Sequence, residues 1–570
     1  MSVKSSAHVV TRGNPLANVT GQGNEVASLL LGDPTSGSLS WSTPTFVTMH
    51  YYGLFVQDDF RMLPTLSFNL GLRWDVNKSP RDRHDRINAG FCLTCANPLT
   101  SQVNYATAPG LQSPLLGGFQ FAGVNGMPDA PFKVQWNDWQ PRVGFSWQGL
   151  PNTVIRGGYG IYFPWSTSAV DDTGFSETTG YIASLDGGLT PSPYLNSGTP
   201  YPSGAVAPTG AGLGLETNAG QSISYNNTQR RIRMTQHWSF GVQRRVPWGI
   251  LLDVEYVGSN VHGIPVTSSL GVITTAQQQA CYAGTIACNA NVANPFYGVL
   301  ATNTGLGAST TIPTWELLRA YPLFNGVSEQ RVPSGDSFYN ALDGRVERRV
   351  KNLDFVFNYM YSNWMSTESY LNSGDYQDAH LWKGLDGNDR RNYLDANMVY
   401  PLPQIHRNRV LNTLADGWLV DNTVIWGTGG PLTLGAADFN WGTPGCTSYA
   451  PVGGQTRAHW LNNNESCWTD RAAWEPRTTP ESVGFIRGPE TVIWNAAFHK
   501  QFPLKREGVF AQFRMEAWNA ANHPTWGGPS TGNDTPPEYS PSTSWTGFGT
   551  LPTSQANIPR TVIASLKIIF

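Results

Sequence analysis

Three short motifs in the sequence carry residue types that could support catalysis or bind a metal or a phosphate. Asp58-Asp59 is a carboxylate pair, Cys92-Leu-Thr-Cys95 has the spacing of half a zinc site, and Gly210-Ala-Gly-Leu-Gly214 has the glycine content of a dinucleotide-binding loop. Each lacks what its chemistry needs. Adjacent strand residues point to opposite faces, and no second Cys/His pair follows at zinc-site spacing. In the glycine run, the third glycine is not at the spacing of a dinucleotide-binding loop, and no helix follows. We therefore predict no catalytic residue, no metal site and no cofactor, and we expect that the chain is not an enzyme.

The six cysteines fall into three local pairs within segments rich in Gly, Asn and Pro. An even number of cysteines, each near a candidate partner, favours disulfide bonds formed in an oxidising compartment over a zinc site at the first pair. Sequence spacing alone does not prove which cysteines pair. Proximity groups Cys92 with Cys95, Cys281 with Cys288, and Cys446 with Cys467.

The composition is that of a sheet protein with many turns. Charged residues make up 14% of the 570 residues and aromatic residues 12%, with 60 Gly and 40 Pro. Few charges and many Trp and Tyr side chains are typical of β-strands flanked by aromatic girdles at two membrane interfaces. The net charge of -3 provides no basic surface, so we expect no nucleic-acid partner.

Alternating apolar and polar residues indicate the strands. The clearest example runs from Leu66 to Asp75, where every even position is apolar and the odd positions are polar or Gly. Because strand side chains alternate between faces, such a strand has one apolar and one polar face. Pairs of strands are predicted over residues 51–75, 141–163, 237–256, 339–361, 392–426 and 493–518, with short connections except for a longer one in the pair at 392–426. Long irregular stretches separate them, at about 77–139, 164–235, 259–337, 363–391, 428–491 and 520–559.

The last strand, residues 560–570, ends on an aromatic residue at the end of the chain. It places Phe570, Ile568 and Leu566 on one apolar face, and chain ends usually fray unless they are tied down. No segment approaches the roughly 18 apolar residues of a membrane helix, but a membrane strand needs only about ten alternating residues. With a weak strand at 26–31, we predict about fourteen antiparallel membrane strands, with short turns on one side and long loops on the other.

Charged residues also occur within these strands, at positions that we assign to the barrel lumen or its rims. We expect them to form cross-strand ion pairs that suit a wet interior. The alternative is that they line a path for a transported substrate. They are Arg156, Arg244, Arg348, Arg514, Glu255, Glu347 and Glu516.

The ordered set of motifs resembles TonB-dependent receptors over nearly the whole chain. Tyr52-Gly-Leu-Phe-Val-Gln-Asp-Asp-Phe60 with the following strand resembles one of their hairpins, and Gln140-Pro-Arg-Val-Gly-Phe145 with Arg156-Gly-Gly-Tyr-Gly-Ile-Tyr162 resembles another. Later segments are similar to the Oar-like subgroup in particular. These include Trp238-Ser-Phe-Gly-Val-Gln-Arg244, Asp389-Arg-Arg-Asn392 and Phe513-Arg-Met-Glu-Ala-Trp-Asn519.

This resemblance implies an all-β, transmembrane antiparallel β-barrel in the bacterial cell outer membrane, with about 22 strands and long extracellular loops. The family's plug, TonB box and signal peptide have no counterpart here, so we expect residues 1–570 to be the carboxyl-terminal barrel part of a longer transporter. In this family a last strand ending in Phe closes the barrel and marks it for insertion, so the resemblance assigns an assembly signal to Phe570, Ile568 and Leu566.

The partners that the resemblance implies are outer-membrane lipid, the barrel assembly machinery, the TonB complex acting through a plug, and a bulky ligand of unknown identity. One alternative is a pore without a plug, or a surface adhesion barrel, whose disulfide-tied loops bind ligands. Another is a secreted carbohydrate-active or lectin-like β-protein, which fits the aromatic loops but not the strand directions or the aromatic terminus.

Overall fold

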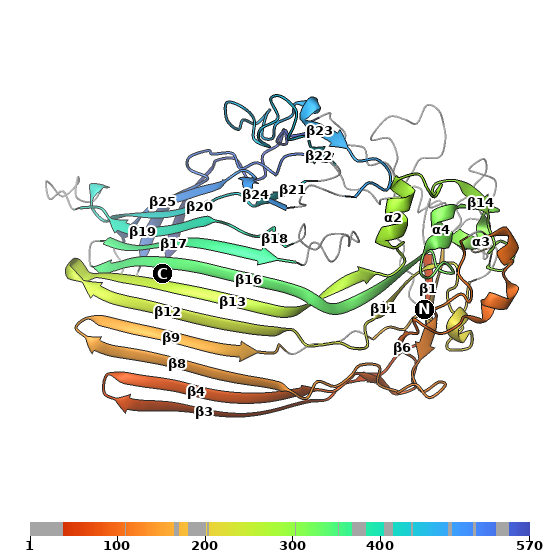
Figure 1. Cartoon of the computed structure of the whole chain (residues 1–570). Coiled ribbons are helices and arrows are strands. Elements are labelled where there is room, and N and C mark those ends of the chain that lie inside the picture. Colours follow the sequence, from red (N-terminus) through yellow and green to blue (C-terminus); the bar gives the residue numbers. More distant parts are fainter. Residues whose placement is uncertain are drawn as a thin grey trace.

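One large antiparallel sheet dominates the computed structural model of the chain (Figure 1). The structure describes residues 38–108, 110–164, 170–180, 201, 205–301, 304–350, 353–367, 383–403, 414–434, 437–476, 482–504, 509–531 and 547–570; the weak strand predicted at 26–31 lies outside them. Consecutive strands of the sheet are hydrogen-bonded neighbours in chain order: β3 (Tyr51–Leu63), β4 (Leu66–Asn77), β8 (Asp138–Leu150), β9 (Thr153–Tyr162), β12 (Met234–Val246), β13 (Ile250–Ser269), β16 (Gly326–Val350), β17 (Leu353–Ser366), β19 (Asn392–Pro401), β20 (Trp418–Gly427), β25 (Thr491–Pro503), β26 (Phe510–Trp518) and β27 (Thr561–Ile569).

The strand pairs predicted from the sequence are confirmed, and so is their antiparallel direction. Most of their connections are short, because the residues there tolerate tight turns, but residues 402–417 separate β19 from β20. Asn152, between β8 and β9, has a φ of 54°, a left-handed conformation that Asn adopts more readily than most residues. Within the described residues the sheet has β3 and β27 as its edges, and two short strands join it beside the main path: β11 (Ser222–Asn226) along β16 and β18 (Gly384–Leu385) along β17.

The strand register separates an apolar face from a polar face. Leu70 lies opposite Val143, and Val143 lies opposite Tyr159, so one row of large side chains crosses three strands on one face. The neighbouring row on the other face is small or polar, with Asn69 opposite Gly144. On the apolar face Leu54 and Leu566 remain 67% and 72% exposed, which suits contact with lipid and not with water.

The long connections are more ordered than the sequence pattern indicated. The predicted irregular stretch at 259–337 is wrong at both ends, because β13 continues to Ser269 and β16 begins at Gly326. Register shifts interrupt the pairing near Ile264 and Val266, so strict alternation is lost there although the two strands stay paired.

The connections also contain short elements of their own. They are β1 (Ser38–Ser42), β2 (Val47–Thr48), β5 (Arg81–Asp82), β6 (Asn88–Phe91), η1 (Pro98–Gln102), η2 (Tyr105–Thr107), β7 (Phe119–Phe121), β10 (Ser176–Gly180), η4 (Gly214–Glu216), η5 (Pro247–Gly249), α2 (Thr275–Tyr282), β14 (Asn291–Ala293), α3 (Gly305–Ala308), β15 (Thr311–Pro313), α4 (Thr314–Leu318), β21 (Pro431–Thr433), β22 (Ala437–Phe439), η7 (Glu465–Cys467), β23 (Trp468–Asp470) and β24 (Ser482–Arg487). No helix in the described part of the chain is long and apolar enough to cross a membrane.

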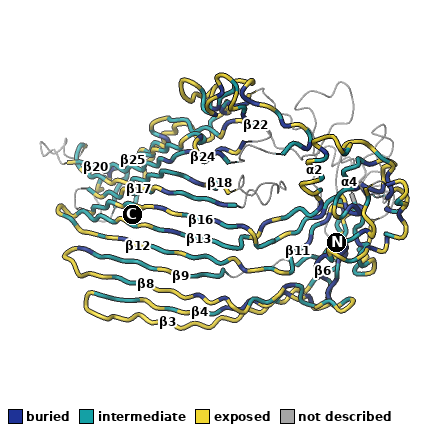
Figure 2. The backbone as a smooth tube through the Cα atoms, viewed as in Figure 1, coloured by how far each residue is buried: buried dark blue, intermediate teal, exposed yellow. Residues whose placement is uncertain are grey.

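The buried residues gather in the long connections and not along the sheet. Figure 2 shows the buried colour concentrated around β6, β11 and α4, while the strands β3, β4 and β8 are largely exposed or intermediate. The largest core joins three connections, because Phe119, Tyr225 and Phe324 all belong to it. A second core contains Leu461 and Phe548 from two further connections. The loops therefore fold as packed units at one end of the sheet.

Three disulfide bonds lie within these connections. Cys92 bonds to Cys95, Cys281 to Cys288, and Cys446 to Cys467. These are the pairs that proximity grouped, and the first pair is a disulfide and not half a zinc site. The second and third bonds contribute to hydrophobic clusters, so each bond holds packed side chains as well as backbone.

Candidate functional site

Two adjoining recesses lie on the polar face of the sheet across β3, β4, β8, β9, β12 and β13. The first, of about 490 Å³, we name the glycine recess, because Gly71, Gly144, Gly158 and Gly160 are among its lining residues. The second, of about 520 Å³, we name the arginine recess, because Arg73, Arg142 and Arg233 line it. Arg142, Tyr162 and His237 line both recesses, so the two form one continuous surface.

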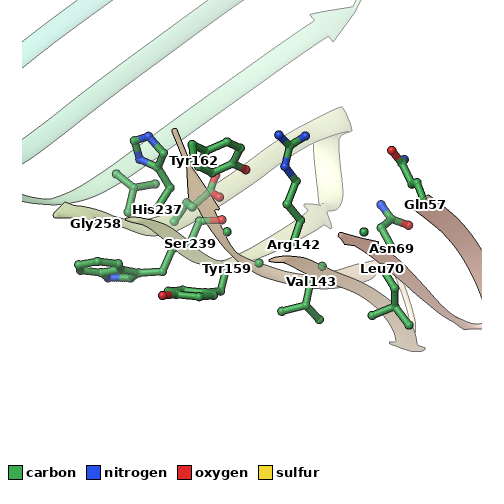
Figure 3. Close-up of a pocket in the computed structure, with 17 residues that line it drawn as sticks. Gln57, Asn69, Leu70, Arg142, Val143, Tyr159, Tyr162, His237, Ser239 and Gly258 are labelled. Carbon is green, nitrogen blue, oxygen red and sulfur yellow. The ribbon is translucent and has the colours of Figure 1, made fainter. Parts of the chain in front are cut away.

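The glycine recess exists because neighbouring strands have glycines, which have no side chain, at adjacent positions of the polar face. In one row across the sheet, Asn69 lies opposite Gly144, Gly144 opposite Gly158, and Gly158 opposite Ser239. Figure 3 shows Arg142, Tyr162 and His237 on one side of these strands, whereas Leu70 and Val143 point to the other. The polar face is therefore hollowed where its residues are smallest.

Tyr162 lies between a cation and an imidazole. The guanidinium carbon of Arg142 is 4.7 Å from the centre of the Tyr162 ring, and the His237 ring is 5.4 Å away on a tilted plane. Gly160 stands between Arg142 and His237 in the strand register. A Cβ at Gly160 would come within 2.7 Å of the Tyr162 hydroxyl, so only glycine lets the ring fold down between its two neighbours.

The arginine recess carries more positive than negative charge. Arg73 binds Asp75 through Nε at 2.8 Å, and Gln140 donates to the same carboxylate at 2.5 Å. In the residues that the structure describes, no carboxylate lies within ion-pairing distance of Arg142 or Arg233. Two guanidinium groups therefore face the recess without an acidic partner from this part of the chain.

A charge network lies deeper on the same face, where sequence reasoning placed it. Arg156 reaches across β12 to Asp253 at 2.8 Å and Glu255 at 3.0 Å on β13. The residue between them on β12 is Gly241, and a Cβ there would lie 3.2 Å from Glu255 Cγ. The missing side chain of Gly241 leaves Arg156 the room to span two strands.

The other charged strand residues divide between the two faces. Arg514 binds Glu516 at 2.5 Å, and Glu347 binds Arg345 at 2.7 Å and Arg349 at 2.7 Å, all on the polar face. Arg244 and Arg348 instead share rows with Leu252 and Phe355, so they face outward, close to the short turns. These two arginines therefore lie at the rim and do not face the lumen, because register counted along a strand and not charge decides the face.

The motifs considered for catalysis are separated by the fold. Asp59 lies opposite Asn69 on the polar face and Asp58 opposite Leu70 on the apolar face, so the two carboxylates do not act together. Among the described residues, no group of three or more His, Cys, Asp or Glu side chains is placed to hold a metal ion. Sequence reasoning missed the grouping of Arg142, Tyr162 and His237. The one sequence feature that points to it is the pair of glycines at alternate positions of β9, Gly158 and Gly160, which leave space on the polar face.

The chain belongs to the family described as the outer membrane beta barrel domain, whose model matches residues 5–562. This family places the chain in the bacterial outer membrane, as the sequence predicted. No curated protein sequence matches the chain.

Several solved structures of outer-membrane receptors and transporters are similar to this chain at low sequence identity. The siderophore receptor PiuA from Acinetobacter baumannii is 9% identical, with 92% of this chain and 43% of that chain covered and a TM-score of 0.37. The ferripyoverdine receptor of Pseudomonas aeruginosa is 8% identical, with 92% and 39% covered and a TM-score of 0.37. The outer membrane transporter YddB from Escherichia coli is 10% identical, with 94% and 65% covered and a TM-score of 0.35. The chain therefore spans about two fifths of the length of the first two receptors.

Proposed function

We propose that this chain forms the barrel part of an Oar-like, TonB-dependent transporter that carries a bulky ligand across the outer membrane. A plug in the remainder of a longer protein would couple the barrel to the TonB complex. The partners of this proposal are outer-membrane lipid, the barrel assembly machinery, the TonB complex and the ligand. Transport needs no catalytic residue, and the proposal includes none.

The observation that supports this proposal is that one sheet has a polar face with two recesses and also large folded loops at one end. A ligand would meet the packed loops first and the arginine and glycine recesses next. The ordered motifs of the sequence support the TonB-dependent assignment, because they follow one another along nearly the whole chain. A narrow, side-chain-filled interior would not suit a bulky ligand.

The test is energy-dependent uptake. Host cells with and without the gene that encodes this chain are offered labelled probes of four kinds: a ferric siderophore, a maltooligosaccharide, a decapeptide and a small folded protein. We expect at least one probe to accumulate only when the gene is present and the proton-motive force is intact. An uncoupler, added just before the probe, should abolish that accumulation.

Two other outcomes would contradict the proposal. Gene-dependent uptake that continues in the presence of the uncoupler would identify a passive pore. Gene-dependent binding to the cell surface without uptake would identify an adhesion barrel. The control is a strain that produces the same chain with the TonB protein inactivated, which should bind the probe but not accumulate it.

A further inference from the structure

The arginine recess has the size and charge of a ligand subsite. Its volume of about 520 Å³ falls in the range of small-molecule sites, roughly 300–1,000 Å³. Among the described residues that line it, Asp75 is the one carboxylate, and Arg73 already binds that carboxylate at 2.8 Å. Arg142 and Arg233 thus add positive charge that the described carboxylates leave uncompensated.

The position of Arg142 prepares it to bind an anion. Its guanidinium lies over the Tyr162 ring at 4.7 Å, and the N–H donors of a guanidinium lie in its own plane. This contact restrains the guanidinium by electrostatic attraction to the ring and supplies no oxygen acceptor that would compete with an anion. A pre-positioned arginine loses less side-chain entropy when it binds a ligand than a mobile one does.

The neighbours of Arg142 in its row leave space for a ligand. Gly71 lies opposite Arg142 on one side and Gly160 on the other. Neither glycine offers a side chain that could cover the guanidinium or compete for it. Thr235 also lines the recess, where its hydroxyl is placed to contact the rest of the ligand.

We propose that the arginine recess binds a carboxylate or phosphate group of the transported ligand, through Arg142 and Arg233. This proposal rests on the transport function proposed above and narrows the substrate class to anionic ligands. Arginine forms paired, parallel hydrogen bonds with both kinds of anion, so the geometry favours these two groups. The adjoining glycine recess would provide space for the uncharged part of the ligand.

The test measures binding of two probes, citrate and inorganic phosphate, to the full-length protein that contains this chain, reconstituted in lipid nanodiscs. Isothermal titration is run at low ionic strength, with glucose as the uncharged control probe. The variants are R142Q, R233Q and the double variant, and the matched control is R244Q, which removes an arginine from the outward face of β12. Strand content by circular dichroism checks that each variant is folded.

We expect saturable binding of at least one anion, weakened roughly tenfold or more in the double variant and unchanged in R244Q, because the double variant loses the charge-assisted hydrogen bonds of both guanidinium groups. Whichever of the two probes binds identifies the anionic group that the recess prefers. Binding of neither anion, equal loss in R244Q, or full binding by the folded double variant would overturn the proposal.

The uptake experiment separates this proposal from the transport function. Energy-dependent uptake that is unaffected by R142Q and R233Q would reject the anion subsite and keep the transporter. Anion binding that depends on both arginines, together with uptake that ignores the uncoupler, would reject energised transport and keep the subsite.

Discussion

At the scale of single residues, the absence of a side chain decides the electrostatics of the inner face. Gly241 allows Arg156 to reach across β12 to two carboxylates on β13, and Gly160 allows Tyr162 to lie between Arg142 and His237. Arg156 and Arg142 are both on the polar face. Arg156 has two carboxylate partners, whereas Arg142 has none among the described residues. The difference comes from which residues stand opposite them and not from the arginines themselves.

Replacing Arg156 by Gln should destabilise the sheet, because Asp253 and Glu255 then lose their shared partner. We expect a loss of about 2 kcal/mol in the free energy of unfolding, below the roughly 3–5 kcal/mol of fully buried pairs, because Arg156 is 41% exposed. Urea-induced unfolding of the wild type and the variant in detergent micelles measures this difference in the free energy of unfolding. Arg349→Gln is the control: its side chain is 73% exposed, so a loss above about 1 kcal/mol there would contradict this reasoning.

Asp82 should make the loop at β5 sensitive to acid. Burial by itself would raise the pKa of Asp82, but backbone N–H groups of Arg86, Phe46 and His84 donate to the carboxylate, and together they hold its pKa below the ordinary value. The charged form is therefore favoured in the folded loop. The stabilisation is fully present above the unfolded pKa of about 3.9 and is lost as the pH falls through the lower folded pKa.

The check is hydrogen exchange of these backbone amides near neutral pH in the wild type and in Asp82→Asn. The variant should exchange roughly tenfold faster or more, since a hydrogen bond to a charged group contributes about 1.5–3 kcal/mol. Unchanged exchange in Asp82→Asn would show that the carboxylate does not hold the loop. Asp129→Asn, at an exposed ion pair with Arg81, provides the control.

At the scale of elements, one tryptophan joins two loops that are far apart in the sequence. Trp474 is 4% exposed and packs in a cluster with the Cys281–Cys288 disulfide. Its Nε1 donates to Asn289 Oδ1 at 3.1 Å, and its carbonyl accepts from Gln278 Nε2 at 3.3 Å. This contact connects the β13–β16 loop with the β20–β25 loop.

Trp474→Ala should release the two loops from each other without unfolding the sheet. Truncation of a buried Trp costs about 3–5 kcal/mol, which is enough to open a local contact. We expect faster hydrogen exchange in α2 and unchanged exchange in β12 and β13. Trp441→Ala is the matched control, because Trp441 is 57% exposed. Protection of α2 that survives Trp474→Ala would mean that α2 is held by its own loop alone.

At the scale of the whole molecule, the sheet and the loops are stabilised in different ways. The strands have backbone hydrogen bonds and two exposed faces, one for lipid and one for a wet interior, whereas the loops bury hydrophobic cores. Assembly therefore depends on insertion into lipid. Deleting Phe570 should impair that insertion, because the chain would lose the aromatic end of the outward row formed with Ile568 and Leu566.

Outer-membrane fractionation, with the heat-dependent gel mobility of the inserted protein, measures the effect of deleting Phe570. We expect the inserted fraction to fall several-fold. Lys567→Ala is the control, because Lys567 lies opposite Gln512 on the polar face of the same strand pair, and it should insert normally. Normal insertion without Phe570 would remove the proposed signal role from these three residues.

The sequence by itself determined the strands, their order and their two faces, because alternation, turn residues and hairpin pairing are local properties of the chain. That is why the strand from Leu66 onward, and the row formed by Leu566, Ile568 and Phe570, could be placed in advance. Tertiary structure alone decided which residues meet across strands. Arg142, Tyr162 and His237 come from three strands. Trp474 contacts Gln278, which lies nearly two hundred residues earlier in the sequence and in a different loop. Such contacts depend on register, missing side chains and loop packing, and none of these leaves a periodic trace in the sequence.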